Sequence, residues 1–88
     1  MIIHPTAIIS EKSKIDNSVE VGPFCIIDED VEIKKGTKLL SHVVLRGPTF
    51  IGEDNIFYQF STIGEDTPDK KFKGEKTELK IGDRNIFR

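Results

Sequence analysis

The feature that most constrains this chain is a large apolar residue at every sixth position. The series is unbroken over most of the chain, and its members are Ile3, Ile9, Ile15, Val21, Ile27, Ile33, Leu39, Leu45, Ile51, Phe57 and Ile63. An α-helix buries one face only when apolar residues recur three and four positions apart, and a six-residue period does not do this. The period instead predicts short strands separated by corners.

A second series follows the first at an offset of four residues. Its members are small, β-branched or uncharged: Ala7, Ser13, Val19, Cys25, Val31, Thr37, Val43, Thr49, Asn55, Ser61 and Thr67. The residues between are mostly polar and include the turn formers Gly22, Gly36, Gly52 and Gly64. Because β-branched residues favour strands and glycines favour tight turns, the sequence predicts an all-β chain wound as a parallel β-helix.

Three hexapeptides per triangular coil would place residues about 18 positions apart above one another. This arrangement predicts three interior columns of apolar side chains. They contain Ile3, Val21, Leu39 and Phe57; Ile9, Ile27, Leu45 and Ile63; and Ile15, Ile33 and Ile51. At about 4.8 Å per rung, about four coils form a prism roughly 19 Å tall. The pattern does not determine the handedness of the coil.

The period fails at Asp69 and Glu75 and then returns in phase at Ile81. A segment of about 12 residues, taken as 69–80, is therefore predicted to loop out at a corner without disturbing the register. Ile81 would complete the third column. The loop is rich in lysine, which suits a phosphate group or an acidic partner, although charged loops are usually only solvated.

Two similar segments, 51–57 and 81–87, flank this insert. If the register is kept, one lies on top of the other. Asn85 then lies over Asn55, and stacked amides can hydrogen-bond along the coil axis.

Composition narrows the class of protein. With 13 basic and 15 acidic residues among 88, the chain has a formal net charge of −2 and no global bias toward nucleic acid or membrane. A single cysteine excludes an internal disulfide and fits a reducing compartment. No apolar run is long enough to span a bilayer, and the first residues lack the layout of a signal peptide. We therefore predict a soluble cytoplasmic domain spanning 1–88.

The remaining chemically reactive residues do not form a site in the sequence. Cys25 occupies a small-residue position of the repeat, which favours a packed, unreactive thiol. His4 and His42 have no carboxylate or cysteine partners at ligand spacing, so we predict neither a metal site nor a cofactor. Phe57 and Phe60 are both interpreted as packing residues, with Phe57 inside.

The pattern resembles the UDP-N-acetylglucosamine acyltransferase family, which begins lipid A biosynthesis in Gram-negative bacteria. The hexapeptide period is shared by many transferases, whereas the insert and its exit are more specific. The resemblance covers essentially all of this chain but only about the N-terminal third of a family member. The matching stretches are 4–8, 22–26, 41–44, 58–65, 69–75 and 81–85.

The resemblance implies a left-handed β-helix, a homotrimer and active sites in clefts between neighbouring subunits. It implies transfer of a 3-hydroxyacyl group from acyl carrier protein to the glucosamine 3-hydroxyl of UDP-N-acetylglucosamine. Asp69 and Lys71 match the family's substrate contacts. Asp69 would accept a hydrogen bond from a sugar or acyl hydroxyl, and Lys71 would offer a cation to substrate oxygens. Pro68 stands where well-known members have glutamine.

The family's general base is a histidine that would lie several coils beyond residue 88. Further coils and a C-terminal helical domain of the family would also follow there. No catalytic residue is therefore predicted within this chain, and the chain alone is expected to be inactive. Two alternatives stay open. One is another hexapeptide acyltransferase, and the other is a non-catalytic β-helix that serves in assembly or binding.

Overall fold

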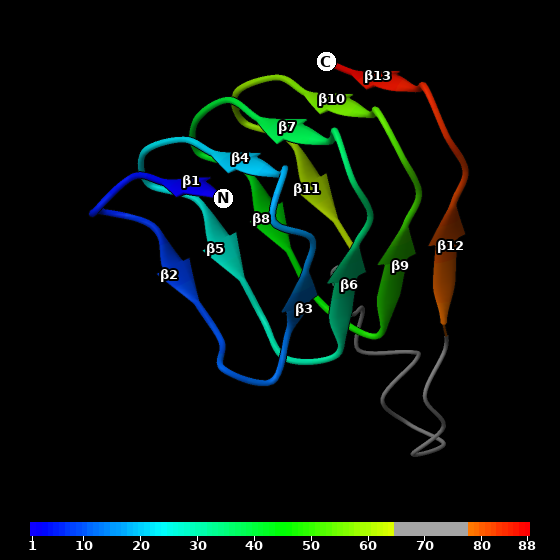
Figure 1. Ribbon diagram of the computed structural model, residues 1–88, viewed down its shortest axis with the longest axis horizontal. Coiled ribbons are helices and arrows are strands. Elements are labelled where there is room, and N and C mark those ends of the chain that lie inside the picture. Colours follow the sequence, from blue (N-terminus) through cyan, green and yellow to red (C-terminus); the bar gives the residue numbers. More distant parts are fainter. Residues whose placement is uncertain (65–77) are drawn as a thin grey trace.

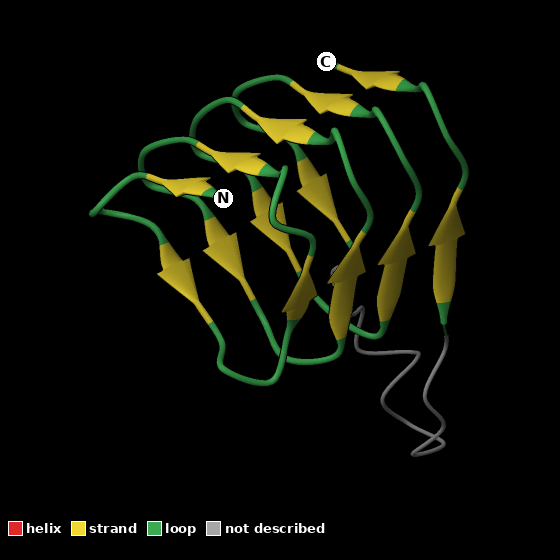
Figure 2. Ribbon diagram, viewed as in Figure 1, coloured by secondary structure: helices red, strands yellow, loops and turns green. Residues whose placement is uncertain are grey.

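The computed structural model describes residues 1–64 and 78–88, and every regular element in these ranges is a short parallel strand (Figures 1 and 2). The strands are two or three residues long and recur at the hexapeptide spacing. They are β1 (Ile2–Ile3), β2 (Ile8–Ile9), β3 (Lys14–Ile15), β4 (Glu20–Val21), β5 (Ile26–Ile27), β6 (Val31–Ile33), β7 (Lys38–Leu39), β8 (Val44–Leu45), β9 (Thr49–Ile51), β10 (Ile56–Phe57), β11 (Thr62–Ile63), β12 (Leu79–Ile81) and β13 (Ile86–Phe87).

The strands form three parallel sheets, which are the three sides of a triangular prism (Figure 1). Sheet A contains β1, β4, β7, β10 and β13; sheet B contains β2, β5, β8 and β11; sheet C contains β3, β6, β9 and β12. Each strand pairs with the strand one coil away rather than with its neighbour in sequence. The predicted parallel β-helix is therefore confirmed.

The predicted register is also confirmed. Ile33 pairs with Ile15 on one side and Ile51 on the other, and Ile51 in turn pairs with Ile81. The other two columns follow the predicted order in the same way. A side-chain period of two along each strand fixes which residue points inward, so a one-residue slip would have turned the whole series outward.

The core consists of these columns together with the second series. Ile33, Ile51 and Phe57 are each 1% exposed or less, and Val19 and Val43 from the second series are fully buried. Burying an aliphatic or aromatic side chain of this size contributes about 1.5–3 kcal/mol relative to exposure. The two inward-facing series are therefore the main source of the fold's stability.

The corners bring successive coils into close contact. A Cβ built on Gly22 would lie 1.5 Å from the carbonyl oxygen of Leu40, one coil above. Several non-glycine corner residues adopt positive φ, which turns the chain sharply and directs their side chains away from the strands. These residues are Phe24, Asp30, His42, Asp54, Phe60 and Arg84.

Strand β12 refines the boundary of the predicted insert. Leu79 pairs with Thr49 and Lys80 pairs with Phe50, so the last two residues of the range 69–80 belong to sheet C. The rest of that range, up to residue 77, lies outside the described residues. No described residue belongs to a helix long and apolar enough to cross a membrane.

Candidate functional site

The two predicted substrate contacts, Asp69 and Lys71, lie outside the described residues. What the structure describes of the candidate site is the corner from which their segment leaves and the strand to which it returns. The segment leaves after Gly64, at the end of β11, and the described chain resumes at Glu78, immediately before β12. Both ends lie at the edge shared by sheets B and C (Figure 1).

The predicted insert leaves the prism directly after Gly64, whose conformation and contacts suit this corner. Its φ is +78°, and a Cβ at this position would come within 2.2 Å of the carbonyl oxygen of Arg46. Only glycine combines a left-handed conformation with this approach of the coil below. The guanidinium of Arg46 in turn pairs with Asp28, one coil further down, at 2.5 Å. An ion pair thus lies on the two coils below the point where the predicted insert departs.

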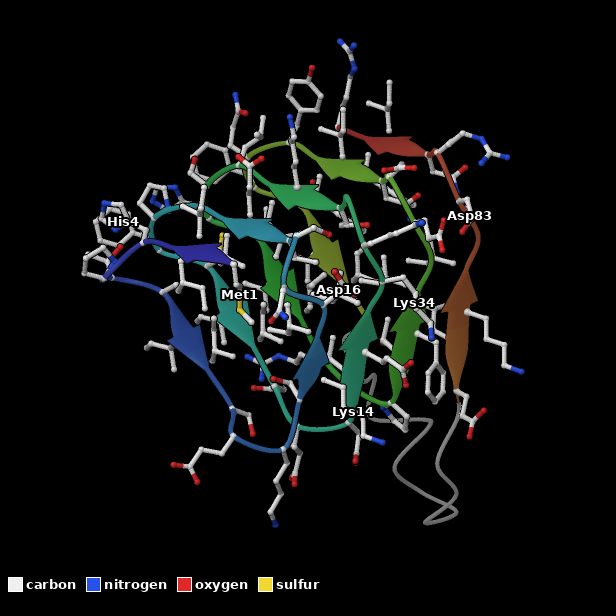
Figure 3. All side chains as sticks on the ribbon, in the orientation of Figure 1. Met1, His4, Lys14, Asp16, Lys34 and Asp83 are labelled. Atoms are coloured by element: carbon white, nitrogen blue, oxygen red, sulfur yellow. The ribbon has the colours of Figure 1, made fainter. Side chains whose placement is uncertain are left out.

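The outer face of sheet C carries a shallow groove of about 330 Å³, and Glu78 is one of the residues that line it. Phe50 and Pro48 supply apolar surface, and Lys12 and Lys14 supply positive charge on one side. Nearby, the Lys34 ammonium lies 3.0 Å from Glu32, and the hydrogen bond and charge of this carboxylate raise the pKa of Lys34. Figure 3 shows Lys14 and Lys34 on this side of the prism. The groove can therefore offer apolar surface and charges of both signs to a ligand.

Asn55 forms a clasp between the coils on either side of the insert. Its side chain is fully buried, its Nδ2 donates to the carbonyl oxygen of Gly82 at 2.8 Å, and its Oδ1 accepts from the N–H of Asn85 at 2.8 Å. The expected pairing of Asn55 with Asn85 is present. The two side-chain amides do not bond to each other, because the Asn55 amide instead bonds to the backbone of the next coil.

Two further hydrogen bonds join the same two coils at the adjoining corner. Asp83 accepts the N–H of Glu53 at 2.7 Å, and the N–H of Arg84 donates to the carbonyl oxygen of Glu53 at 2.9 Å. Gly52 leaves room for this carboxylate, since a Cβ there would lie 2.1 Å from Asp83 Oδ1. The chain that returns from the insert is therefore fixed to the preceding coil by both side chains and backbone.

The corner between sheets A and B carries a column of exposed rings. His42 lies between Phe24 and Phe60, with ring centroids 5.1 Å and 5.0 Å apart. The interpretation of Phe60 as a packing residue is wrong in location: its side chain is 76% exposed, because positive φ at the corner turns it away from the core. Phe57, by contrast, is buried and stacks on Phe87, with ring centroids 4.6 Å apart.

The other reactive side chains have local partners. His4 Nδ1 accepts the N–H of Thr6 at 3.2 Å and lies 2.8 Å from the Thr6 hydroxyl oxygen. The predicted packing of Cys25 is confirmed, and burial raises the pKa of its thiol, which favours the protonated form. Hydrogen bonds from the Ser18 N–H and hydroxyl lower the pKa of Asp16.

No protein-family model matches the chain. It is 57% identical over 86 residues to the acyl-[acyl-carrier-protein]–UDP-N-acetylglucosamine O-acyltransferase of Saccharophagus degradans, a match that covers 98% of this chain and 33% of that protein. The protein of the same name from a Psychrobacter species is 50% identical over 86 residues, with the same shares covered. The crystal structure of UDP-N-acetylglucosamine O-acyltransferase from Moraxella catarrhalis superposes on the whole of this chain with a TM-score of 0.92 and 46% identity, and 34% of that chain is covered.

The chain thus spans about a third of the length of the curated relatives it matches, and the matching part is their N-terminal third. The resemblance inferred from the sequence is confirmed at this level. Likeness to these solved structures also settles the winding direction, which the hexapeptide pattern left open. The fold is a left-handed parallel β-helix.

Proposed function

We infer, from the match between this chain and the N-terminal third of UDP-N-acetylglucosamine O-acyltransferases, that it supplies one wall of the substrate cleft of such an enzyme. The reaction is transfer of a 3-hydroxyacyl group from acyl carrier protein to the glucosamine 3-hydroxyl of UDP-N-acetylglucosamine, in lipid A biosynthesis. The observation that carries the proposal is the 57% identity over 86 residues with an acyltransferase of this name.

Within this wall, Asp69 and Lys71 are the proposed substrate contacts. The Asp69 carboxylate accepts a hydrogen bond from a sugar or acyl hydroxyl, and the Lys71 ammonium pairs with substrate oxygens. Hydrogen bonds to charged groups contribute about 1.5–3 kcal/mol each. Losing one of them is therefore expected to lower the rate by roughly 10- to 100-fold if the bond persists in the transition state.

The proposal gains support from how firmly the scaffold holds both ends of the segment that carries these residues. Gly64 lies against Arg46 on the departing side, and the Asn55 clasp holds Gly82 and Asn85 on the returning side. A rigid frame limits the positions that a functional loop can take up, and so reduces the entropy that substrate binding must overcome. A loop that served only solubility would not need this frame.

A chimera tests the proposal directly. The 86 matching residues of the Saccharophagus degradans enzyme are replaced by those of this chain, and acyl transfer to UDP-N-acetylglucosamine is measured. We expect a kcat/KM within about tenfold of the parent, a loss of no more than about 1.4 kcal/mol of transition-state stabilisation. An inactive chimera that folds and assembles normally would contradict the proposed function.

Substitutions in the active chimera then test the two residues. Lys71→Ala is expected to lower kcat/KM by about tenfold or more, with an unchanged Tm, because its ammonium serves the substrate rather than the core. Lys70→Ala is the matched control, since it removes the same charge one position away. A large loss of Tm in Lys71→Ala, or equal effects of both substitutions, would assign this lysine to the scaffold.

The proposed enzyme is cytoplasmic and works as a homotrimer, with UDP-N-acetylglucosamine and acyl carrier protein as its substrates. The proposal of these two substrates rests on the name that the two relatives share. The single buried thiol, Cys25, fits a reducing compartment. Sedimentation of the active chimera tests the trimer, and a monomeric active species would exclude it.

A further inference from the structure

The corner between sheets C and A carries all three asparagines of the chain, Asn17, Asn55 and Asn85. Asparagine is a chemically labile residue. Its side-chain amide is lost when the backbone nitrogen of the next residue attacks Cγ, closes a five-membered succinimide ring and expels ammonia. The reaction needs a small following residue, a backbone nitrogen that can leave its hydrogen bond, and a side-chain amide that can rotate toward that nitrogen.

The following residue is small only at Asn17, where it is Ser18. Asn55 and Asn85 are each followed by an isoleucine, which is the first residue of β10 and of β13 respectively. A β-branched side chain is stiff and crowds the backbone beside it. The attack on Cγ is therefore hindered at Asn55 and Asn85, and the succinimide ring closes more readily at Asn17.

The backbone N–H of Ser18 is bonded to a side chain rather than to a neighbouring coil. It donates to Oδ1 of Asp16 at 3.0 Å, and the Asp16 side chain is exposed. The corresponding nitrogen after Asn55 belongs to Ile56, whose N–H donates to the carbonyl oxygen of Asn85 in the next coil at 2.9 Å. Freeing the Ile56 nitrogen requires two coils to separate. Freeing the Ser18 nitrogen requires only the rotation of one surface carboxylate, which is a much smaller opening of the structure.

The side-chain amide of Asn17 can also rotate. Its side chain is exposed and, within residues 1–64 and 78–88, forms no hydrogen bond. The Asn55 amide, by contrast, is fully buried and is held by both the Gly82 carbonyl oxygen and the Asn85 N–H. Opening of the succinimide ring consumes water, which reaches the exposed Asn17 but not the buried Asn55. All the requirements of the reaction are therefore met at Asn17.

We propose that Asn17 is a site of spontaneous modification, at which the asparagine converts to aspartate and isoaspartate through a succinimide formed with Ser18. A bond forms between the Ser18 nitrogen and Asn17 Cγ, the Cγ–Nδ2 bond breaks, and ammonia leaves with the proton of the Ser18 N–H. Water, the co-reactant, then opens the ring at one of its two carbonyl carbons. Cleavage of the new bond gives aspartate. Cleavage of the original peptide bond gives isoaspartate, in which the main chain runs through Cγ.

The two products differ in their effect on the corner. Both place a carboxylate at position 17 and make the formal net charge of −2 more negative by one unit. The register of β3 and β6 places Lys35 one coil above this position, so the aspartate product can pair with its ammonium. Isoaspartate instead adds one atom to the main chain of the turn, where the N–H of Val19 donates to the carbonyl oxygen of Asp16 at 3.1 Å. The isoaspartyl form is therefore expected to loosen the turn between β3 and β4.

The test is incubation of the whole chain at about 37 °C and about pH 8 for about four weeks, followed by tryptic digestion and peptide mass spectrometry. The tryptic peptide 15–34 contains Asn17 as its one amide side chain, so the mass gain of this peptide reports Asn17 alone. We expect at least about tenfold more conversion at Asn17 than at Asn55. Direct hydrolysis of the amide would yield aspartate alone, whereas the succinimide also yields isoaspartate, which an isoaspartyl methyltransferase labels.

Ser18→Val tests the role of the following residue. It adds a β-branched side chain beside the attacking nitrogen and is expected to slow conversion at Asn17 at least about fivefold. Ser18→Ala is the matched control, because it removes the same hydroxyl, which accepts the Gly36 N–H at 2.8 Å, but leaves a small side chain. It is expected to keep the rate within about threefold of the wild-type rate. Equal rates in the two variants overturn the proposal, as does conversion at Asn17 no greater than at Asn55, or a product without isoaspartate. Because no substrate is used, the outcome is independent of the proposed reaction.

Discussion

Asn55 is the residue at which a small change should most clearly separate the insert from the scaffold. Asn55→Ala removes two hydrogen bonds of 2.8 Å, one to Gly82 and one from Asn85. Each such hydrogen bond contributes about 1 kcal/mol net to stability. The cost is larger when the remaining partner is buried and cannot bond to water instead. Gly82 and Asn85 are exposed, so water can replace part of the loss. We therefore expect unfolding to become easier by about 2 kcal/mol, out of a total of roughly 4–13 kcal/mol for a domain of this length.

The assay is urea denaturation followed by far-UV circular dichroism, combined with amide hydrogen exchange. The N–H of Asn85 is expected to lose protection before the amides of the inner coils, because its acceptor is the deleted side chain. Asn17→Ala, at an exposed asparagine, is the control and should change stability by less than about 0.5 kcal/mol. An Asn55→Ala variant as stable as this control would refute the clasp.

Asn55→Asp adds a pH-dependent test of the same geometry. Its carboxylate could still accept from Asn85 but would face the carbonyl oxygen of Gly82 without a proton to donate. Burial and this oxygen raise the pKa of the new carboxyl above its unfolded value of about 3.9. The loss of folding stability caused by the charged carboxylate is then absent below about pH 3.9, and it grows as the pH rises through the folded-state pKa. At pH 7 the Asp variant should be less stable than the Ala variant, and the gap should narrow toward pH 4. A gap independent of pH would exclude a carboxylate facing this oxygen.

Three further predictions concern the scaffold. Gly22→Ala should lower the free energy of unfolding by several kcal/mol in urea denaturation, because its Cβ would lie 1.5 Å from the Leu40 carbonyl oxygen. Gly82→Ala is the control and should be close to neutral, since a Cβ there has no neighbour within 4 Å. Equal effects would contradict the stacking at this corner. Ile33→Asp should abolish the β-sheet circular dichroism, because an unpaired carboxylate at a 1% exposed position costs several kcal/mol; a normally folded variant would disprove the column. The Cys25 thiol, whose pKa is raised by burial, should react with a thiol reagent at pH 8 at least about tenfold more slowly in the folded chain than in urea. Equal rates would show that this thiol is accessible.

The sequence predicted the interior of the prism well because one physical rule governs it. Along a strand, inward and outward side chains alternate, so the phase of the apolar period fixes every coil at once. The pairing of Ile51 with Ile81 across the insert follows from this rule. The winding direction does not, since mirror-image coils would bury the same side chains.

The corners were less predictable because their backbone conformation, and not the apolar period, directs their side chains. Phe60 is as apolar as Phe57, yet a φ of +66° turns it outward onto His42. The Asn55 amide was expected to bond to Asn85 along the axis and instead spans from the Gly82 carbonyl to the Asn85 N–H.

The in-register return of β12 has a consequence for how such a scaffold acquires new chemistry. Because Leu79 and Ile81 rejoin sheet C opposite Thr49 and Ile51, the coils above and below do not depend on what joins β11 to β12. In general, doubling the length of a loop between two fixed ends costs only about 0.6 kcal/mol. This corner is therefore a place where segments of different length and composition can be exchanged while the prism keeps its shape, so specificity can change without a change of fold.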